Sequence, residues 1–318
     1  MFIEHFKITG IAVFQIFLLA GIGFFLTKRK FLSSQGLDDL GGLVMDVTLP
    51  VLIFCQLIKD FSFSLYSDWW IFPLISITIT FLGLFVGFLF VGFIKGEQEK
   101  LQFLGSVAFQ NSGYLPLALV AALLSPEKVG EMFIYLFLFL MGFNLIMFSL
   151  GVHILNFHKE RKLKVQSLLS MPVLATLFSL VVVYLGWGKF FPEVVIKPLR
   201  IFGDTTLPLA MLVVGGNLAQ ISLAHINKKA VSLLILAKMI ILPLIGIALL
   251  SIFKVPELIG LLIIIQLAMP SAVTLSVILR GHKKDDILAS QGIFVTHLAG
   301  VITIPIFLIL YFSRFMVK

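Results

Sequence analysis

The sequence predicts an all-α polytopic membrane protein with ten transmembrane helices in two inverted repeats of five helices. Three observations lead to this prediction: an apolar composition, a series of ten apolar stretches, and a motif that occurs twice. Of the 318 residues, 59% are hydrophobic and 13% are charged, whereas a soluble domain is about half apolar and a quarter charged. So much apolar surface needs a bilayer around it, and a soluble binding module is excluded.

Each predicted span is a stretch of about 20 mostly apolar residues, the length that crosses the hydrocarbon core. The first stretch is expected to stay in the protein, because the N-terminus lacks the basic segment and cleavage site of a signal peptide. The single Cys55 excludes an intramolecular disulfide and a metal site built from several cysteines. The ten stretches are 9–27, 37–57, 69–94, 101–124, 130–157, 167–187, 197–220, 229–253, 256–279 and 287–312.

Lysine and arginine are distributed unevenly over the predicted loops. Alternate loops, beginning after the first stretch, carry 14 of the 24 basic residues, and the other side carries nine. The positive-inside rule therefore predicts a multi-pass protein of the cell membrane with both termini extracytoplasmic. The same rule explains the formal net charge of +8, so we expect no nucleic-acid partner.

The repeated motif is DVTLPVLIF at Asp46–Phe54 and DTTLPLAML at Asp204–Leu212, 158 residues apart. The copies lie in the second and seventh spans, which suggests two repeats of five spans. An odd number of spans per repeat makes the two repeats insert in opposite directions, an arrangement common in secondary transporters. The basic stretch Lys159–Lys164 is the natural join, which gives one repeat over 1–158 and a second over 159–318.

Prolines in the spans predict interruptions of helix. Each proline leaves the carbonyl four residues earlier without its helical partner, and the freed carbonyl needs another partner in hydrocarbon. Pro50 and Pro208 of the repeated motif are compatible with a plain kink. NSGYLP before Pro116 favours a true break, and the matching place of Pro270 favours a second. The freed carbonyls belong to Asp46, Ser112, Asp204 and Gln266.

We expect residues 111–116 and 266–271 to meet near the membrane midplane as two non-helical segments. Four half-helix ends would then surround one small volume. N-terminal ends attract a carboxylate, whereas carbonyl ends attract a cation or a hydrogen-bond donor.

Three charged residues inside the spans each allow two interpretations. Lys238 either pairs with an acid such as Asp204, or attracts the substrate carboxylate or replaces a coupling cation. Asp46 and Asp204 either bond the opened backbone and cap the next half-helix together with Thr48 and Thr206, or one of them is a protonatable coupling site. Ordinary interhelical hydrogen bonds are expected for Gln110, Asn144, Asn217 and His297.

Motifs of known enzymes are absent from the sequence. It contains no GxxxxGK[ST] phosphate loop, no HExxH and no GxSxG. We also find no set of nucleophile, base and acid. The sequence therefore predicts neither an enzyme, nor a cofactor, nor a metal site.

The segments NSGYLPLAL, GDTTLPLAMLVVGGNLA and QLAMPSAVTLSVILRGH, in this order within ten spans, resemble the auxin efflux carrier family. That family includes plant PIN-type auxin carriers and bacterial malate permeases. The resemblance covers essentially the whole chain, but the long cytoplasmic loop of many plant members is absent. It implies two inverted repeats with crossing broken helices, a fold like that of sodium/proton antiporters and bile-acid symporters. Spans 1, 2, 6 and 7 would form a scaffold, and spans 3–5 and 8–10 a mobile transport domain.

The resemblance implies a secondary active transporter of a small organic anion, such as malate or an auxin-like acid, that works by elevator-type alternating access. Scaffold placement would make Asp46 and Asp204 structural. The alternatives are an intramembrane enzyme that uses Asp46 and Asp204 as an aspartyl pair, and a passive anion channel. A proton or sodium coupling ion and a homodimer are left open. The substrate-binding residues, carried over by position except for Lys238, are Asn111, Ser112, Gly113, Pro116, Gln266, Pro270, Ser271 and Lys238.

Overall fold

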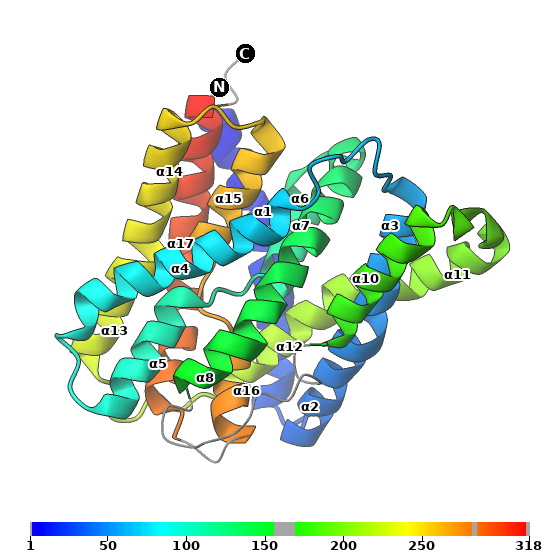
Figure 1. Ribbon diagram of the computed structural model, residues 1–318. Coiled ribbons are helices and arrows are strands. Elements are labelled where there is room, and N and C mark those ends of the chain that lie inside the picture. Colours follow the sequence, from blue (N-terminus) through cyan, green and yellow to red (C-terminus); the bar gives the residue numbers. More distant parts are fainter. Residues whose placement is uncertain (1, 156–168, 282–284, 316–318) are drawn as a thin grey trace.

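The structure is a computed structural model that describes residues 2–155, 169–281 and 285–315. Within these ranges the regular elements are helices, and one isolated β-bridge is the only strand-like pairing. The two ends of the described chain lie close together at one end of the molecule (Figure 1). The predicted join of the repeats at Lys159–Lys164 lies outside the described residues.

The helices follow one another with short connections. They are, in chain order, α1 (Phe2–Lys28), α2 (Ser34–Leu43), a π-helix (Val44–Thr48), α3 (Leu49–Asp60), α4 (Ile71–Val91), α5 (Glu97–Ala108), α6 (Tyr114–Leu123), α7 (Pro126–Ile146), a second π-helix (Met147–Gly151), α8 (Val152–Leu155), α10 (Met171–Tyr184), a 3-10 helix (Trp187–Phe190), α11 (Glu193–Asp204), α12 (Thr206–Gln220), α13 (Lys228–Leu234), a third π-helix (Ile235–Ile241), α14 (Leu242–Ile252), α15 (Glu257–Ala268), α16 (Thr274–Gly281) and α17 (Ile287–Phe315).

Seven helical segments of the described chain are long and apolar enough to cross a membrane. Three shorter apolar helices, α6, α10 and α15, fall within three further predicted stretches. The prediction of an all-α polytopic membrane protein is therefore confirmed. The seven long segments are Phe6–Lys28, Ser34–Asp60, Ile71–Val91, Pro126–Leu155, Glu193–Gln220, Lys228–Ile252 and Ile287–Phe315.

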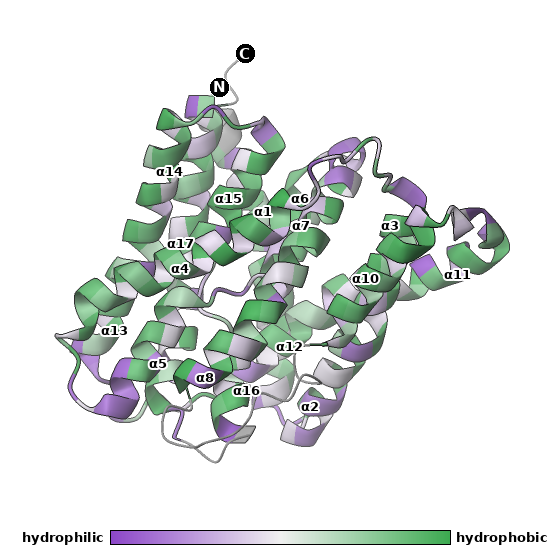
Figure 2. Ribbon diagram, in the orientation of Figure 1, coloured by the Kyte–Doolittle hydropathy of each residue, from purple (hydrophilic) through white to green (hydrophobic). Residues whose placement is uncertain are grey.

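The outer surface of the helices is apolar, as a bilayer requires. Figure 2 shows hydrophobic residues along the helix bodies and hydrophilic residues concentrated at the connections. On α4, the side chains of Phe81, Phe85 and Phe88 are 53%, 61% and 70% exposed. A row of exposed phenylalanines would cause aggregation of a soluble protein, but it contacts lipid favourably in a membrane.

Two groups of helices can be distinguished by their packing. α1 lies along α12, and α3 packs against α10 and α11. In the second group, α4 packs against α5 and α7, and α17 packs against α15 (Figure 1). The groups meet where α1 packs against α6 and α17. The α1–α12 contact is so close that a Cβ on Gly215 would lie 1.7 Å from the Ala20 carbonyl oxygen. Glycine is therefore needed where these two backbones touch.

The two copies of the repeated motif touch through equivalent residues. The Thr206 hydroxyl donates to the Thr48 hydroxyl at 2.9 Å, and both side chains are fully buried. The capping interpretation is wrong, because neither α3 nor α12 begins with a side-chain cap. In the first copy the π-helix continues into α3, and the Leu49 N–H bonds the Val44 carbonyl across its wider turn. This turn absorbs the change at the proline without help from a side chain.

Candidate functional site

Two interruptions of helix cross near the centre of the molecule (Figure 1). Residues 109–113 separate α5 from α6 and form the first break, and residues 269–273 separate α15 from α16 and form the second break. Pro116 lies in the first turn of α6, where its missing N–H costs no helical bond. Gln266 is still helical, because proline displaces mainly the residue just before it, and Pro270 lies in the break itself. Each break is thus displaced by two or three residues from the predicted segment.

Backbone hydrogen bonds join the two breaks. The Asn111 N–H donates to the Pro270 carbonyl at 2.8 Å, and the Ala272 N–H donates to the Phe109 carbonyl at 3.0 Å. These bonds form the isolated antiparallel bridge. They satisfy groups that have lost their helical partners, as a membrane interior requires. The breaks therefore meet, as the sequence predicts, and together they are called the crossover.

A glutamine side chain satisfies the carbonyl that Pro116 frees. The Gln266 amide nitrogen donates to the Ser112 carbonyl at 3.2 Å, and its amide oxygen accepts from the Gln110 side chain at 3.5 Å. Gln266 therefore stabilises the backbone of the first break. The Gln110 amide oxygen is buried and has no hydrogen-bond partner within the described part of the chain.

Lys238 also stabilises the crossover, through the end of α5. Its ammonium donates to the Val107 carbonyl at 2.8 Å, and the side chain is 1% exposed. Val107 belongs to the last turn of α5, where carbonyls have no helical partner and the helix dipole is negative. Pairing with an acid was therefore the wrong interpretation. The salt bridges between described residues lie elsewhere, at Lys100–Glu97 and Arg280–Asp286.

A cavity of about 60 Å³ lies at the crossover, and the first residues of α6 and α16 face it. Its volume is well below the roughly 300–1,000 Å³ of a usual ligand pocket, so the site is closed in this structure. Amides and hydroxyls provide its polar groups, and its lining contains neither lysine nor arginine. The lining residues are Met45, Leu49, Gln110, Asn111, Ser112, Gly113, Tyr114, Leu140, Phe143, Asn144, Ala272, Val273 and Thr274.

The predicted site residues fall into two sets. Asn111, Ser112 and Gly113 line the cavity, whereas the others do not line it. Ser271, for example, donates through its hydroxyl to the Ser106 carbonyl at 2.7 Å. The predicted site residues that do not line the cavity are Pro116, Gln266, Pro270, Ser271 and Lys238.

Sequence reasoning missed four polar residues of the lining. Tyr114 and Thr274 are the first residues of α6 and α16, and only the exact position of each break reveals them. Gln110 and Asn144 were expected to make ordinary hydrogen bonds. The Asn144 side chain, 8% exposed, has no hydrogen bond to a described residue. An amide in the middle of the apolar stretch 130–157 was the signal that could have identified it.

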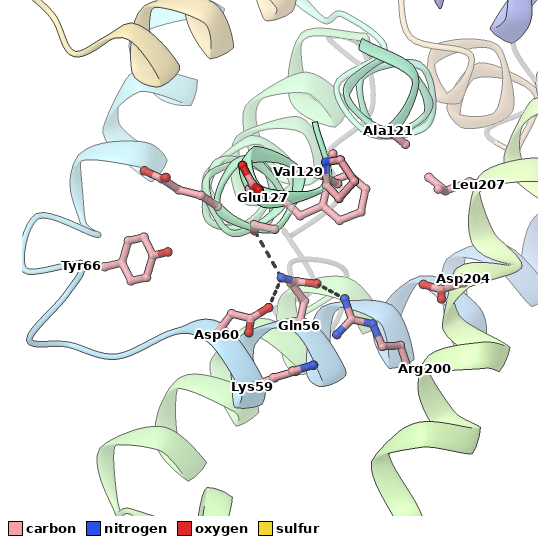
Figure 3. A pocket seen from close by; sticks show the side chains of 14 residues that line it. Gln56, Lys59, Asp60, Tyr66, Ala121, Glu127, Val129, Arg200, Asp204 and Leu207 are labelled. Carbon is pink, nitrogen blue, oxygen red and sulfur yellow. Dashed lines mark hydrogen bonds between the residues drawn. The ribbon is translucent and has the colours of Figure 1, made fainter. Parts of the chain in front are cut away.

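A larger crevice of about 590 Å³ opens between α3, α7 and α11. Figure 3 shows Gln56 at its centre. Arg200 donates to the Gln56 amide oxygen at 3.2 Å, and the Gln56 nitrogen donates to Asp60 at 2.6 Å and to the Gly130 carbonyl at 3.3 Å. Gln56 thereby ties α3 and α11 to α7. Burial and the carboxylates of Glu131 and Asp60 raise the pKa of nearby Tyr66, whose hydroxyl therefore stays neutral.

The two acids of the repeated motif lie at different places. Asp204 ends α11 and lines the crevice beside Arg200. Asp46 lies in the first π-helix, is exposed and lines neither cavity. An aspartyl enzyme needs two carboxyls that share one site. The positions of these acids give no such site.

Comparison with known proteins places the chain among transporters. The family described as membrane transport protein matches residues 9–308. An uncharacterized transporter, MJ1031, of Methanocaldococcus jannaschii is 24% identical over 303 residues, which cover 92% of this chain and 96% of that protein. PIN-LIKES 7 of Arabidopsis thaliana is 22% identical over 354 residues, 86% of this chain and 89% of the relative. PIN-LIKES 6 of the same plant is 28% identical over 120 residues, which cover 37% of this chain and 28% of the relative.

Proposed function

The chain belongs to the auxin efflux carrier family of membrane transport proteins, and from this premise we propose that it carries a small organic anion across the membrane. The substrate would be a carboxylate such as malate or an auxin-like acid, moved by elevator-type alternating access as a secondary active transporter. The observation that carries the proposal is the crossover, where two helices begin at one polar cavity. The positive end of the helix dipole makes such helix starts suited to an anion.

The proposal includes ten spans in two inverted repeats, 1–158 and 159–318. Two contacts support this arrangement. Thr48 and Thr206, 158 residues apart, touch each other, as equivalent residues next to a two-fold axis do. The two backbone bonds of the crossover are also related: if Asn111 is paired with Ala272 and Phe109 with Pro270, exchanging the two breaks turns each bond into the other. The breaks themselves begin 160 residues apart, at 109 and 269.

The packing supports a scaffold of spans 1, 2, 6 and 7, which comprise α1, α2–α3, α10 and α11–α12. These helices pack on one another, and α5 and α15, which lead into the breaks, pack on α4, α14 and α17, while α6 also contacts α1 and α12 of the scaffold. The large crevice lies between α3 and α11 of the scaffold and α7 of the transport domain. An elevator needs such a boundary, because the transport domain must slide along the scaffold.

The substrate carboxylate would bind to amides, hydroxyls and helix ends rather than to a cationic side chain. The closed cavity must widen before an anion enters, which alternating access provides by a change between two populated conformations. Of the residues expected from the sequence, Asn111, Ser112 and Gly113 would contact the substrate, joined by Asn144 and Thr274. Gln266, Pro270, Ser271 and Pro116 would hold the shape of the breaks.

Lys238 would supply the positive charge that the carbonyl end of α5 attracts. Its ammonium already occupies that end, 2.8 Å from the Val107 carbonyl. This contact supports the interpretation in which Lys238 replaces a coupling cation, and not the one in which it binds the substrate directly. Asp46 and Asp204 remain proposed as structural acids of the scaffold.

The orientation is also part of the proposal. The basic connections before α5 and α13 lie at the end of the molecule opposite the termini (Figure 1). The positive-inside rule puts that end in the cytoplasm and the termini outside, in the cell membrane.

A thermal-shift screen of the purified protein tests the proposed substrate class. A ligand that binds the native state raises its melting temperature. We expect one or more small carboxylates, among them malate or indole-3-acetate, to stabilise the protein, and uncharged amides of the same acids to have no effect. A screen in which the amides stabilise as well as the acids, or in which no carboxylate stabilises at all, would contradict the proposal.

A further inference from the structure

The helix α17 holds both breaks through two consecutive residues. The Thr296 hydroxyl accepts from the Ser271 N–H of the second break at 3.2 Å while it donates to the Gly292 carbonyl at 2.8 Å. The next residue, His297, lies with its Nε2 3.4 Å from the Asn111 side-chain nitrogen of the first break. One turn of α17 thus connects the two breaks to each other.

The position of the His297 proton follows from its hydrogen bonds. Its Nδ1 lies 2.8 Å from the Ile293 carbonyl, which only accepts, so Nδ1 must carry the proton. In a neutral ring Nε2 is then an acceptor, and it must face a donor. The group that it faces is the amide nitrogen of Asn111.

The histidine thereby determines which way the Asn111 amide points. With its nitrogen held by His297, the Asn111 oxygen is directed to the Leu115 N–H at 3.5 Å, in the first turn of α6. Without His297, only the long hydrogen bond from the Leu115 N–H would oppose a rotation of the amide by 180°, which exchanges its oxygen and nitrogen. The reversed amide would present a donor to the Leu115 N–H, which is itself a donor.

We propose that His297 is a positioning residue that fixes the orientation of the Asn111 side chain at the crossover. His297 does not touch the small cavity. It is 1% exposed and lines a separate apolar cavity of about 210 Å³ between α1, α12 and α17. Its effect on the substrate would therefore pass through Asn111, which does line the site. This inference rests on the proposed function, because it assigns a role within the proposed binding site.

Substitutions distinguish positioning from simple packing. His297→Gln retains an acceptor at the place of Nε2, whereas His297→Leu retains volume without one. Thr303→Val is a matched control, because it removes a polar group of the same helix that bonds only within it, to the Ala299 carbonyl. The binding of malate and indole-3-acetate is measured for each variant, together with the melting temperature without ligand.

We expect about tenfold weaker binding for His297→Leu, the loss of one oriented hydrogen bond, and near wild-type binding for His297→Gln and Thr303→Val. In the Asn111→Ala background, His297→Leu should weaken binding no further, because the two residues act as one unit. Wild-type binding by His297→Leu, or a full additional tenfold loss in the double variant, would overturn the inference.

A spectroscopic measurement tests the same inference without a substrate. Nitrogen-15 NMR of histidine-labelled protein, assigned with His297→Gln, should show His297 neutral with its proton on Nδ1, and Asn111→Ala should shift its Nε2 signal. A proton on Nε2, or a signal that Asn111→Ala leaves unchanged, would overturn the inference. If no carboxylate of the thermal-shift screen binds the wild-type protein, the proposed function fails, while this measurement still decides the contact between His297 and Asn111.

Discussion

At the scale of single residues, the polar groups of the crossover separate into those that hold the breaks and those that face the cavity. Lys238 and Gln266 use their donors on backbone carbonyls of α5 and of the first break. Asn144 faces the cavity and makes no hydrogen bond to a described residue. Removing a group that bonds the backbone should lower stability, whereas removing a group that faces the cavity without a partner should weaken substrate binding.

Lys238→Met should lower the melting temperature and abolish transport. The substitution leaves the Val107 carbonyl buried without its donor, a cost of about 1–3 kcal/mol. It also removes the positive charge beside the carbonyl end of α5. Lys228→Met, an exposed lysine at the start of α13, is the control. Wild-type melting and uptake by Lys238→Met would show that its contact with α5 has no role.

Asn144→Leu should weaken substrate binding without lowering stability. The buried amide has no hydrogen-bond partner among the described residues, so an apolar side chain of similar size costs little or stabilises the fold. Asn217→Leu provides the control, because Asn217 lies on α12 and lines neither cavity. Melting curves and carboxylate binding are compared for both. Unchanged binding by Asn144→Leu would remove Asn144 from the site.

At the scale of helices, the contact of α1 with α12 and the contact of α3 and α11 with α7 differ in kind. α1 and α12 touch through backbone at Gly215, which leaves no freedom to slide. The contact of α3 and α11 with α7 runs instead through the side chain of Gln56 (Figure 3). Side-chain hydrogen bonds exchange more readily than interlocked backbones, as the proposed boundary between scaffold and transport domain would require.

Gly215→Ala should destabilise the protein strongly, by about 3 kcal/mol or more, because the added methyl group meets the Ala20 carbonyl 1.7 Å away and a backbone cannot rotate aside. Gly10→Ala is the matched control on α1, where an added Cβ meets nothing within 4 Å. Yield after detergent extraction and melting temperature provide the measurement. Equal behaviour of the two variants would contradict the packing of α1 on α12.

The helices could be predicted from the sequence better than the breaks within them. Long apolar stretches and prolines indicate where spans and interruptions lie, because hydrocarbon imposes both. The exact limits of a break depend on contacts across the molecule, such as the Asn111 N–H with the Pro270 carbonyl. The partner of Lys238 was missed for the same reason. A sequence shows acids as candidate partners, whereas the Val107 carbonyl becomes available only after α5 has ended.

At the scale of the whole molecule, polar connections gather at two ends and apolar helices lie between them (Figure 2). The termini and the loop that follows α3 share one end, and the connection before α5 lies at the other (Figure 1). The excess of basic residues on the second end predicts that it faces the cytoplasm.

Single cysteines test this orientation. Ser64→Cys, in the loop after α3, and Gln98→Cys, at the start of α5, both replace exposed residues. The native Cys55 is buried and should react little. In intact cells a membrane-impermeant thiol reagent should label Ser64→Cys and leave Gln98→Cys unlabelled until the cells are opened. The reverse pattern would place the termini in the cytoplasm.

Counterflow in proteoliposomes tests the central claim most directly. Vesicles that contain the purified protein are loaded with a carboxylate that stabilises it, and a trace of the labelled acid is added outside. A carrier exchanges its substrate, so the account predicts that label accumulates transiently above its equilibrium level, and that Asn111→Ala reduces this accumulation. Label that only equilibrates at the same rate with and without internal carboxylate would indicate a passive channel and contradict the account.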